Sequence, residues 1–496
     1  MRSLTSSLSL LAVGALQGAS ALDAAGWRNQ SIYQIITDRF ATSDGSTPAC
    51  DTTTGLYCGG TWKGITSKLD YIQNMGATAI WISPIVKNVE RNINGYGEGY
   101  HGFWAEDIYS INPHFGTEAD LKELADSLHA RGMYLMIDVA PNHVGPNDDP
   151  GNYAKYKPFN MPEYYHKECP IAWNNITSEQ LCWLYSLPDL RTEDAYVRQV
   201  YASWIKDLVA KYSIDGLRVD TALEIEPEFF SEGGFREAAG VFLLAEVEGD
   251  LEALYQSINK MASTASIDPS VWGSFVENQD QIRFANRNSD VALAKNLYSL
   301  VMLRDGIPIV YYGQEQHFNG GADPHNREAL WLGGYDIHSE LYGWIQQTNK
   351  VRVHAAAANA DFLTRERTRA VFSYGGKDSS RVIALRKGQL FSMYTNGGVG
   401  ATNNVMFAVA RNFHGFAVGS DVVDVMNCES FQVASQGRLW VQMPDGGLPR
   451  VFLPKEQAEG LCNDVKAPLA SATIKVGVDE NTGCNKRSVP FVATVL

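Results

Sequence analysis

The stretch Asp215-Gly216-Leu217-Arg218-Val219-Asp220-Thr221 is a short apolar run that carries an arginine and an aspartate two residues apart. Successive side chains of an extended strand alternate between its two faces, so Arg218 and Asp220 are predicted to share one face. Asp220 would then stand at the carboxyl end of the strand. An isolated pair of this kind is more often a surface ion pair that closes a buried strand, so its meaning depends on the strands around it.

Strand and helix candidates alternate on both sides of this stretch. Apolar runs predict further buried strands at 31–36, 77–82, 134–138, 241–246, 273–280 and 306–312. Apolar periodicity predicts helices between them at 61–75, 117–132, 195–212, 251–262 and 290–304. Thr117 and Asp120 have the spacing of a helix-capping pair. The alternation indicates a parallel sheet wrapped by helices, spanning residues 22–140 and 189–368.

Two segments depart from this alternation and predict further domains. Residues 141–188 are rich in Pro, Asn, Gly and Tyr, which is typical of a functional loop or a small inserted subdomain. From residue 369 to 465, short alternating strands with Gly and Asn turns predict an all-β domain. Residues 466–496 are predicted to form a flexible tail. Its only apolar run, 489–496, is shorter than the roughly 10–20 residues of a lipid-anchor signal.

Composition and the N-terminus bound the function. The formal charge of −15 over 496 residues leaves no basic patch for nucleic acid, and an acidic, aromatic-rich chain suits a neutral ligand such as a sugar. Arg2, the apolar run 8–16 and Ala19-Ser20-Ala21 predict a signal peptide over 1–21 and therefore a secreted protein. No run reaches the about 18 apolar residues of a transmembrane helix.

Seven cysteines support an oxidising compartment. Proximity in sequence favours two disulfides, Cys50 with Cys58 and Cys169 with Cys182, and Cys428 with Cys462 is a further candidate pair. Cys484 is left over. Two glycosylation sequons, beginning at Asn29 and Asn175, fit secretion.

Three acidic residues, Asp220, Glu246 and Asp280, follow predicted strands. The carboxyl ends of the strands of a (β/α) barrel form one rim, so these side chains are expected to converge there. Two carboxylates that flank a glycosidic bond can hydrolyse it with retention, one as nucleophile and one as general acid. Any one alone would more often be a structural strand-end acid, whereas three beside Arg218 favour catalysis.

The motifs around these acids resemble those of fungal secreted α-amylases of the α-amylase glycosidase family (glycoside hydrolase family 13). The resemblance runs from about residue 27 to 462, and its motifs are Tyr100-His101-Gly102-Phe103-Trp104, Asp138-Val139-Ala140-Pro141-Asn142-His143, Ser186-Leu187-Pro188-Asp189-Leu190, Gly216-Leu217-Arg218-Val219-Asp220, Glu246-Val247, Phe275-Val276-Glu277-Asn278-Gln279-Asp280 and Asp323-Pro324-His325-Asn326-Arg327-Glu328. It implies a TIM-type (β/α)8 barrel, an inserted domain B with a calcium site, and a C-terminal antiparallel β-sandwich.

The resemblance implies a role for each matching residue. Asp220 would be the nucleophile, Glu246 the acid/base, and Asp280 the acid that distorts and stabilises the sugar. Arg218 would keep Asp220 ionised, since a neighbouring cation lowers a carboxyl pKa. The remaining ligands of an α-1,4-glucan would be Asp138, His143, His101, Phe103 (where the family has a stacking tyrosine), Trp104, Gln279, Asp323 and Arg327. The protein is expected to act as a monomer.

The same resemblance implies a Ca²⁺ site. Its oxygen ligands would come from Asn142, Gln180, Asp189 and the backbone carbonyl of Glu224. Gln180 stands where the family has a glutamate. Calcium tolerates mixed oxygen donors, so binding is expected, but more weakly than is usual for the family.

Three departures leave alternatives open. Leu223 and Glu224 replace a Lys-His pair on the acceptor side, and Gln279 replaces a histidine at the cleavage point. The short span from Glu246 to Asp280 omits one strand-helix unit, which takes about 30 residues, so seven barrel strands are predicted instead of eight. The first hypothesis is an α-amylase-type hydrolase. The alternatives are a 4-α-glucanotransferase associated with the cell wall and a weakly active or non-catalytic α-glucan-binding regulator.

Overall fold

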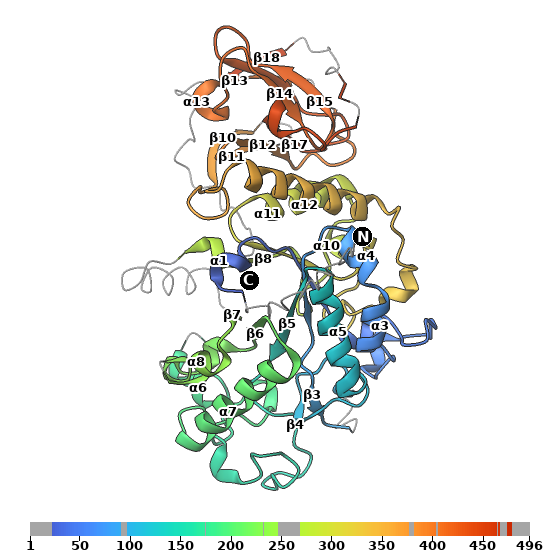
Figure 1. Cartoon of the computed structure of the whole chain (residues 1–496), viewed down its shortest axis with the longest axis vertical. Helices are drawn as coiled ribbons and strands as arrows, with labels where there is room; N and C mark the ends of the chain where they lie inside the picture. The colour runs from blue at the N-terminus through green and yellow to red at the C-terminus, as the bar shows by residue number, and fades with distance from the viewer. Residues whose placement is uncertain are drawn as a thin grey trace, which may run out of the picture.

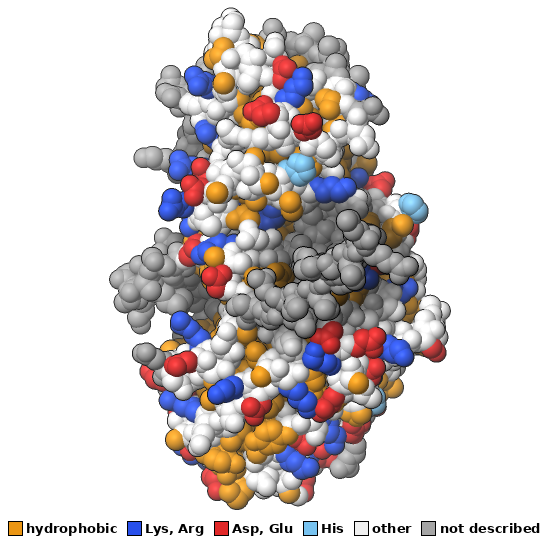
Figure 2. All heavy atoms as spheres, viewed as in Figure 1, with side chains coloured by type: hydrophobic (Ala, Val, Ile, Leu, Met, Phe, Trp, Pro, Cys, Tyr) orange, Lys and Arg blue, Asp and Glu red, His pale blue; other side chains and the backbone are white. Residues whose placement is uncertain are grey.

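The computed structural model describes residues 22–90, 97–173, 175–231, 233–246, 268–375, 381–402, 405–463 and 465–466, and the backbone of 474–478. The predicted signal peptide, the predicted helix 251–262 and Cys484 lie outside these residues. The molecule is elongated, with the C-terminal strands at one end, a barrel in the middle and the inserted segment at the far end (Figure 1). Acidic and basic side chains are interspersed on the face shown in Figure 2.

A parallel sheet curves into a nearly closed barrel. Its seven strands are β1 (Ile32–Ile35), β2 (Ala79–Ile82), β5 (Tyr134–Val139), β6 (Gly216–Val219), β7 (Phe242–Ala245), β8 (Gly273–Ser274) and β9 (Ile307–Tyr311). They are ordered β7-β6-β5-β2-β1-β9-β8. Among the described residues, β7 and β8 are therefore the two ends of the sheet. The prediction of seven strands is confirmed for this part of the chain, although β8 is far shorter than the predicted strand 273–280.

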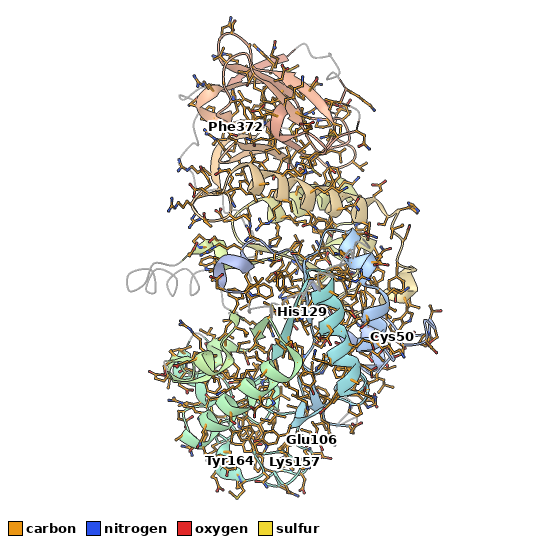
Figure 3. All side chains as sticks on the ribbon, viewed as in Figure 1. Cys50, Glu106, His129, Lys157, Tyr164 and Phe372 are labelled. Atoms are coloured by element: carbon orange, nitrogen blue, oxygen red, sulfur yellow. A yellow bond between two sulfur atoms is a disulfide. The ribbon has the colours of Figure 1, made fainter. Side chains whose placement is uncertain are left out.

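The opening stretch is tied to its surroundings at both ends. A Cβ atom on Gly216 would lie 2.6 Å from the ring of Trp27, so only glycine lets this tryptophan fill the barrel floor. Asp215 accepts hydrogen bonds from Leu135 N (2.8 Å) and His129 Nε2 (2.8 Å), which join β6 to β5 and to helix α5 (Glu118–Ala130). His129 on this helix is labelled in Figure 3. The strand is thus held in register before its functional residues begin.

Helices cover the outside of the barrel. They are α1 (Ala24–Trp27), α2 (Thr37–Phe40), α3 (Trp62–Ser67), α4 (Leu69–Asn74), α5 (Glu118–Ala130), α7 (Ala195–Tyr212), α8 (Phe235–Ala239), α10 (Phe284–Arg287), α11 (Val291–Leu303) and α12 (Glu340–Ala358). The predicted capping pair of Thr117 and Asp120 forms a complete capping box on α5. The predicted helix 61–75 is divided at Lys68, whose backbone leaves the helical region. No helix in the described part of the chain is long and apolar enough to cross a membrane.

The segment 141–188 lies beyond the barrel rim and contains little regular structure, with α6 (Ile176–Leu181) as its one α-helix among the described residues. A hairpin of β3 (Val86–Asn88) and β4 (Ala105–Ile111), which was not predicted, lies beside it. The predicted disulfide Cys169–Cys182 closes the segment onto α6.

The C-terminal domain consists of two sheets. One has the order β10-β11-β12-β17-β14-β15 and the other β16-β13-β18. Their strands are β10 (Arg369–Gly375), β11 (Arg381–Lys387), β12 (Leu390–Thr395), β13 (Val405–Ala410), β14 (Asp421–Asp424), β15 (Glu429–Gln432), β16 (Arg438–Gln442), β17 (Arg450–Pro454) and β18 (Ile474–Val478), with a short helix α13 (Arg411–His414). All strand pairs are antiparallel except β13 with β18, which lies in the range predicted as a tail. The predicted disulfide Cys428–Cys462 is present, and apolar residues of α11 and α12 pack against the larger sheet.

Candidate active site

Arg218 is the centre of the site. It lies on β6 opposite Asp138 of β5, and its Nη1 donates to both oxygens of Asp138 at 3.0 and 3.2 Å. The same guanidinium also forms ion pairs with Asp220, immediately after β6, and with Glu246, immediately after β7. Three acids from neighbouring strands therefore converge on one buried cation. Arg218 and Asp220 lie on the same face, as their spacing predicted.

Burial and charge act in opposite directions on these acids. Burial raises the pKa of Asp220 above its usual range, and the cation of Arg218 opposes that shift. Burial likewise raises the pKa of Asp138 to about 7, again against the effect of Arg218. Arg218 is thus the group that favours the ionised forms of Asp138 and Asp220 in this enclosed position.

Thr221 fixes the next part of the site. Its backbone is left-handed (φ 48°), an uncommon conformation for a β-branched residue. In this conformation its N–H donates to Glu246 Oε2 at 2.9 Å. Glu246 is therefore held through both oxygens, by Arg218 on one and by Thr221 on the other.

Aromatic and imidazole rings line the wall beside the acids. The guanidinium carbon of Arg218 lies 5.3 Å from the ring centroid of Trp81 and 5.9 Å from the ring centroid of Phe103. The His101 ring is stacked on the ring of Phe103. It lies nearly perpendicular to the Trp104 ring, and the centroids of these two rings are 4.7 Å apart.

His101 and His143, the two histidines expected to bind the sugar, are in their neutral form at neutral pH. Burial lowers the pKa of His143 to about 4 and holds that of His101 well below its usual value. His143 Nδ1 is buried and has no hydrogen-bond partner among the described residues.

Asp280 belongs to a second cluster on the same rim. It lies beyond the two-residue strand β8, in a loop, so it is not the strand-end residue that was predicted. Arg327 holds it, donating from Nη2 at 3.2 Å, while Arg327 Nη1 forms an ion pair with Asp323 at 3.0 Å. Although the Asp280 side chain is 40% exposed, the loss of water around its carboxyl raises its pKa to about 6, and Arg327 opposes that shift.

Gln279 is held by residues from two other elements. Its side-chain carbonyl accepts a hydrogen bond from Gln34 of β1, and its backbone carbonyl accepts one from Asn326 at 2.7 Å. Gln34 is a buried polar side chain in an otherwise apolar strand. That contrast is visible in the sequence and marks Gln34 as a residue of the site that the motifs did not identify.

The candidate calcium ligands form two groups. Asp189 accepts hydrogen bonds from Asn142 Nδ2 (3.0 Å) and from His166 Nδ1 (2.6 Å). Gln180 places its amide nitrogen 3.5 and 3.4 Å from the carbonyls of Leu223 and Ile225, on either side of Glu224. Among the described residues, no cluster of three His, Cys, Asp or Glu side chains could hold a metal ion. Besides the carboxylate of Asp189, the candidate calcium ligands are therefore amide and carbonyl oxygens.

Comparisons with known proteins agree with this geometry. A model of the α-amylase catalytic domain matches residues 34–234 and 236–382, and one of α-amylase domain C matches 377–468. An α-amylase of Saccharomycopsis fibuligera is 40% identical over 479 residues, covering 88% of this chain and 94% of that protein. α-Amylase 1 of Schwanniomyces occidentalis is 40% identical over 484 residues, with 88% and 92% covered.

A solved structure of an α-amylase has a similar fold. An α-amylase from Malbranchea cinnamomea, 42% identical, superposes with a TM-score of 0.79 and covers 88% of this chain and 99% of its own. The barrel, the C-terminal sheets and the rim of acids are thus accompanied by similarity along most of the chain. The protein belongs to the α-amylase family, glycoside hydrolase family 13, and is a glycosidase.

Proposed function

We propose that this glycosidase hydrolyses internal α-1,4 bonds of starch and maltooligosaccharides, with Asp220 as nucleophile and Glu246 as acid/base. The observation that carries the proposal is the contact of Arg218 with Asp138, Asp220 and Glu246 at once. A single cation keeps one carboxylate available for attack and orients the other beside it.

The reaction would proceed in two displacements. A carboxylate oxygen of Asp220 attacks the anomeric carbon while the glycosidic C–O bond breaks, and Glu246 gives its proton to the departing oxygen. Water then attacks the same carbon, Glu246 takes a proton from that water, and the ester to Asp220 breaks. Each step inverts the anomeric centre, so the product retains the α configuration.

The surrounding residues would bind the sugar and stabilise the transition state. Neutral His101 and His143 would donate hydrogen bonds to sugar hydroxyls, and His143 Nδ1 is one of several buried polar atoms without a partner among the described residues. Phe103 and Trp104 offer aromatic faces to the ring. Asp138, Gln279 and Asp280 contact the sugar at the cleavage point, while Asp323 and Arg327 hold the next sugar towards the non-reducing end.

Calcium would join domain B to the barrel through Asn142, Gln180, Asp189 and the carbonyl of Glu224. The donor chemistry fits, because calcium takes oxygen ligands of mixed kinds. Only Asp189 in this set brings a formal charge, and that carboxylate also contacts His166. The ion would stabilise the position of the segment that carries Asp189 and Gln180, and it takes no part in the chemical steps.

Restoring a carboxylate at position 180 is expected to strengthen calcium binding. Gln180→Glu adds a second formal charge to the donor set and should tighten the calcium Kd by about tenfold, since charge count tunes such sites. The measurement is the difference in Tm between calcium and chelator, together with calorimetric titration. Gln180→Met, which removes the side-chain oxygen, should bind more weakly than the wild type. Equal affinities in all three proteins would exclude residue 180 as a ligand.

The protein would be exported and act outside the cell as a monomer. Residues 1–21 have the pattern of a signal peptide, and Asn29 and Asn175 of the two sequons are exposed. The three disulfides Cys50–Cys58, Cys169–Cys182 and Cys428–Cys462 suit an oxidising compartment.

Incubation with maltopentaose tests the reaction. Hydrolysis by the proposed route releases only shorter oligosaccharides, and their reducing ends are initially in the α configuration, as NMR can record. Longer products would mean that a sugar hydroxyl intercepts the intermediate. The comparisons do not favour that outcome, but Leu223 and Glu224 on the acceptor side make it the one to measure. A β-configured first product would contradict the mechanism.

A further inference from the structure

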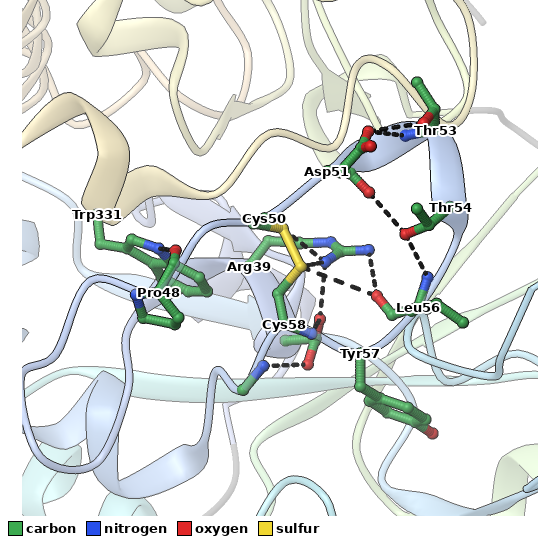
Figure 4. Close-up of a disulfide and its surroundings, with 12 residues drawn as sticks. Arg39, Pro48, Cys50, Asp51, Thr53, Thr54, Leu56, Tyr57, Cys58 and Trp331 are labelled. Carbon is green, nitrogen blue, oxygen red and sulfur yellow. Dashed lines mark hydrogen bonds and ion pairs between the residues drawn. A yellow bond between two sulfur atoms is a disulfide. The ribbon is translucent and has the colours of Figure 1, made fainter.

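Arg39 is a fully buried arginine whose partners lie in the loop closed by Cys50–Cys58 (Figure 4). Its Nη1 donates to Cys50 Sγ at 2.8 Å and also contacts Cys58 Sγ. Its Nη2 donates to the carbonyl of Leu56 at 3.0 Å, and Asp38 supplies the counter-charge at 3.1 Å. A buried cation is costly unless its donors are satisfied, so the folded loop and Arg39 depend on each other.

Tyr100 links this cation to the substrate site. The guanidinium carbon of Arg39 lies 4.0 Å from the centre of the Tyr100 ring, within the range of a cation–π contact. At the other end of the same ring, the Tyr100 hydroxyl accepts a hydrogen bond from Arg327 Nη1 at 3.2 Å. Arg327 is the residue that holds Asp280 and Asp323. The chain of contacts therefore runs from the disulfide through two side chains to the rim.

The disulfide loop and the residues just before it also contact the segment 323–331, which carries Asp323 and Arg327. Trp331 Nε1 donates to the carbonyl of Pro48 at 2.8 Å, and Thr52 Oγ1 lies 3.4 Å from His325 Nδ1. Two independent contacts thus support the same part of the site. Neither involves a residue that would touch the substrate.

We propose that Arg39 and the Cys50–Cys58 disulfide are positioning residues for the non-reducing side of the substrate site. They fix the ring of Tyr100, and Tyr100 in turn holds Arg327 between Asp280 and Asp323. This inference rests on the proposed function, because it assigns a role in binding the same α-glucan.

The charge of Arg39 also acts on the wall of the site. Burial is the main cause of the low pKa of His101, and the cations of Arg327 and Arg39 lower it further. Arg39 therefore favours the neutral imidazole as well as the placement of Arg327. Both effects depend on the guanidinium and not on the volume of the side chain.

Two variants with a matched control test the proposal. Tyr100→Phe keeps the ring above Arg39 and removes the oxygen that accepts from Arg327. The double variant Cys50→Ala/Cys58→Ala removes the sulfur atoms and opens the loop, while Cys428→Ala/Cys462→Ala removes a disulfide in the C-terminal domain. Each is measured for Tm and for kcat and KM on maltoheptaose. The Kd of maltoheptaose is measured by calorimetry with Glu246→Gln added to each.

Tyr100→Phe and the Cys50/Cys58 variant are expected to raise KM and Kd by about tenfold, the size of one charge-assisted hydrogen bond. The Cys428/Cys462 variant should stay within about twofold of the wild-type Kd, since its disulfide is in another domain. A fall in kcat that follows Tm, with KM and Kd unchanged, would show a purely structural role and overturn the proposal. Failure of the Glu246→Gln protein alone to bind maltoheptaose would instead remove the proposed function, and this inference with it.

Discussion

Replacing Asp220 with asparagine is expected to lower kcat on soluble starch by about 10⁴-fold or more, because an amide cannot form the glycosyl ester. Asparagine has nearly the same shape as aspartate and can still accept a hydrogen bond from Arg218. The two remaining acids, Asp138 and Glu246, keep the arginine paired. The fold should therefore persist, and the Tm, measured by calorimetry, should stay within a few degrees of the wild-type value.

A substrate that needs no acid separates the roles of the two residues. An α-maltosyl fluoride releases fluoride without protonation, so Glu246→Gln should still form the ester on Asp220. It should then hydrolyse the ester slowly, because no general base activates water. Mass spectrometry is expected to find a maltosyl group on the peptide that contains Asp220. The double variant Asp220→Asn/Glu246→Gln serves as the control and should carry none. An adduct on any other residue would refute the assignment.

Replacing Arg218 with methionine is expected to abolish measurable activity and to destabilise the protein by about 3–5 kcal/mol, the cost of leaving buried charges without their partner. Asp138, Asp220 and Glu246 would then face one another without a cation. Burial raises the pKa of Asp138 and Asp220, and only Arg218 opposes that shift strongly. Without the cation, the pKa of Asp220 would rise further and its carboxylate would be harder to form.

The pH dependence of this loss has a definite sign. A carboxyl group whose pKa is higher in the folded than in the unfolded state stabilises the fold below the unfolded pKa. That stability is lost as pH rises through the folded pKa. The folded pKa of Asp138 is about 7 in the wild type and should be higher without the cation, so the Tm gap between wild type and Arg218→Met should widen as pH rises above about 7, measured by calorimetry. Arg218→Lys keeps the charge, but a lysine cannot reach three acids at once. The Tm of this variant should therefore lie between those of the wild type and Arg218→Met. A gap that does not change with pH would mean that the cost is one of packing.

The sequence predicted most of the barrel because strands such as β1, β2, β5 and β6 are short, mainly apolar runs between turn residues. β1, β2 and β6 are buried along their whole length and β5 in all but its first residue, so local hydrophobicity was enough to locate them. Strand alternation also placed Arg218 and Asp220 on one face. Two disulfides followed from proximity in sequence, and these and the third candidate pair, Cys428–Cys462, are all present.

Other features depend on contacts between distant residues, which no local pattern reveals. Trp81 looks like a core residue of β2, yet its indole nitrogen donates to Asp138 Oδ2 at 3.1 Å. His166 has no motif around it and becomes a partner of Asp189 only when the inserted segment folds back. The position of Asp280 was misjudged because Arg327, and not a strand, holds it.

The pairing of β1 with β9 governs when the enzyme can finish folding. Ile32 pairs with Ile309, so one edge of the first strand stays open until nearly the whole catalytic chain has left the ribosome. Contacts between residues so distant in sequence form slowly, and open strand edges are sites where chains associate wrongly. The longer β1 lacks this partner during synthesis, the longer its edge is available for wrong association.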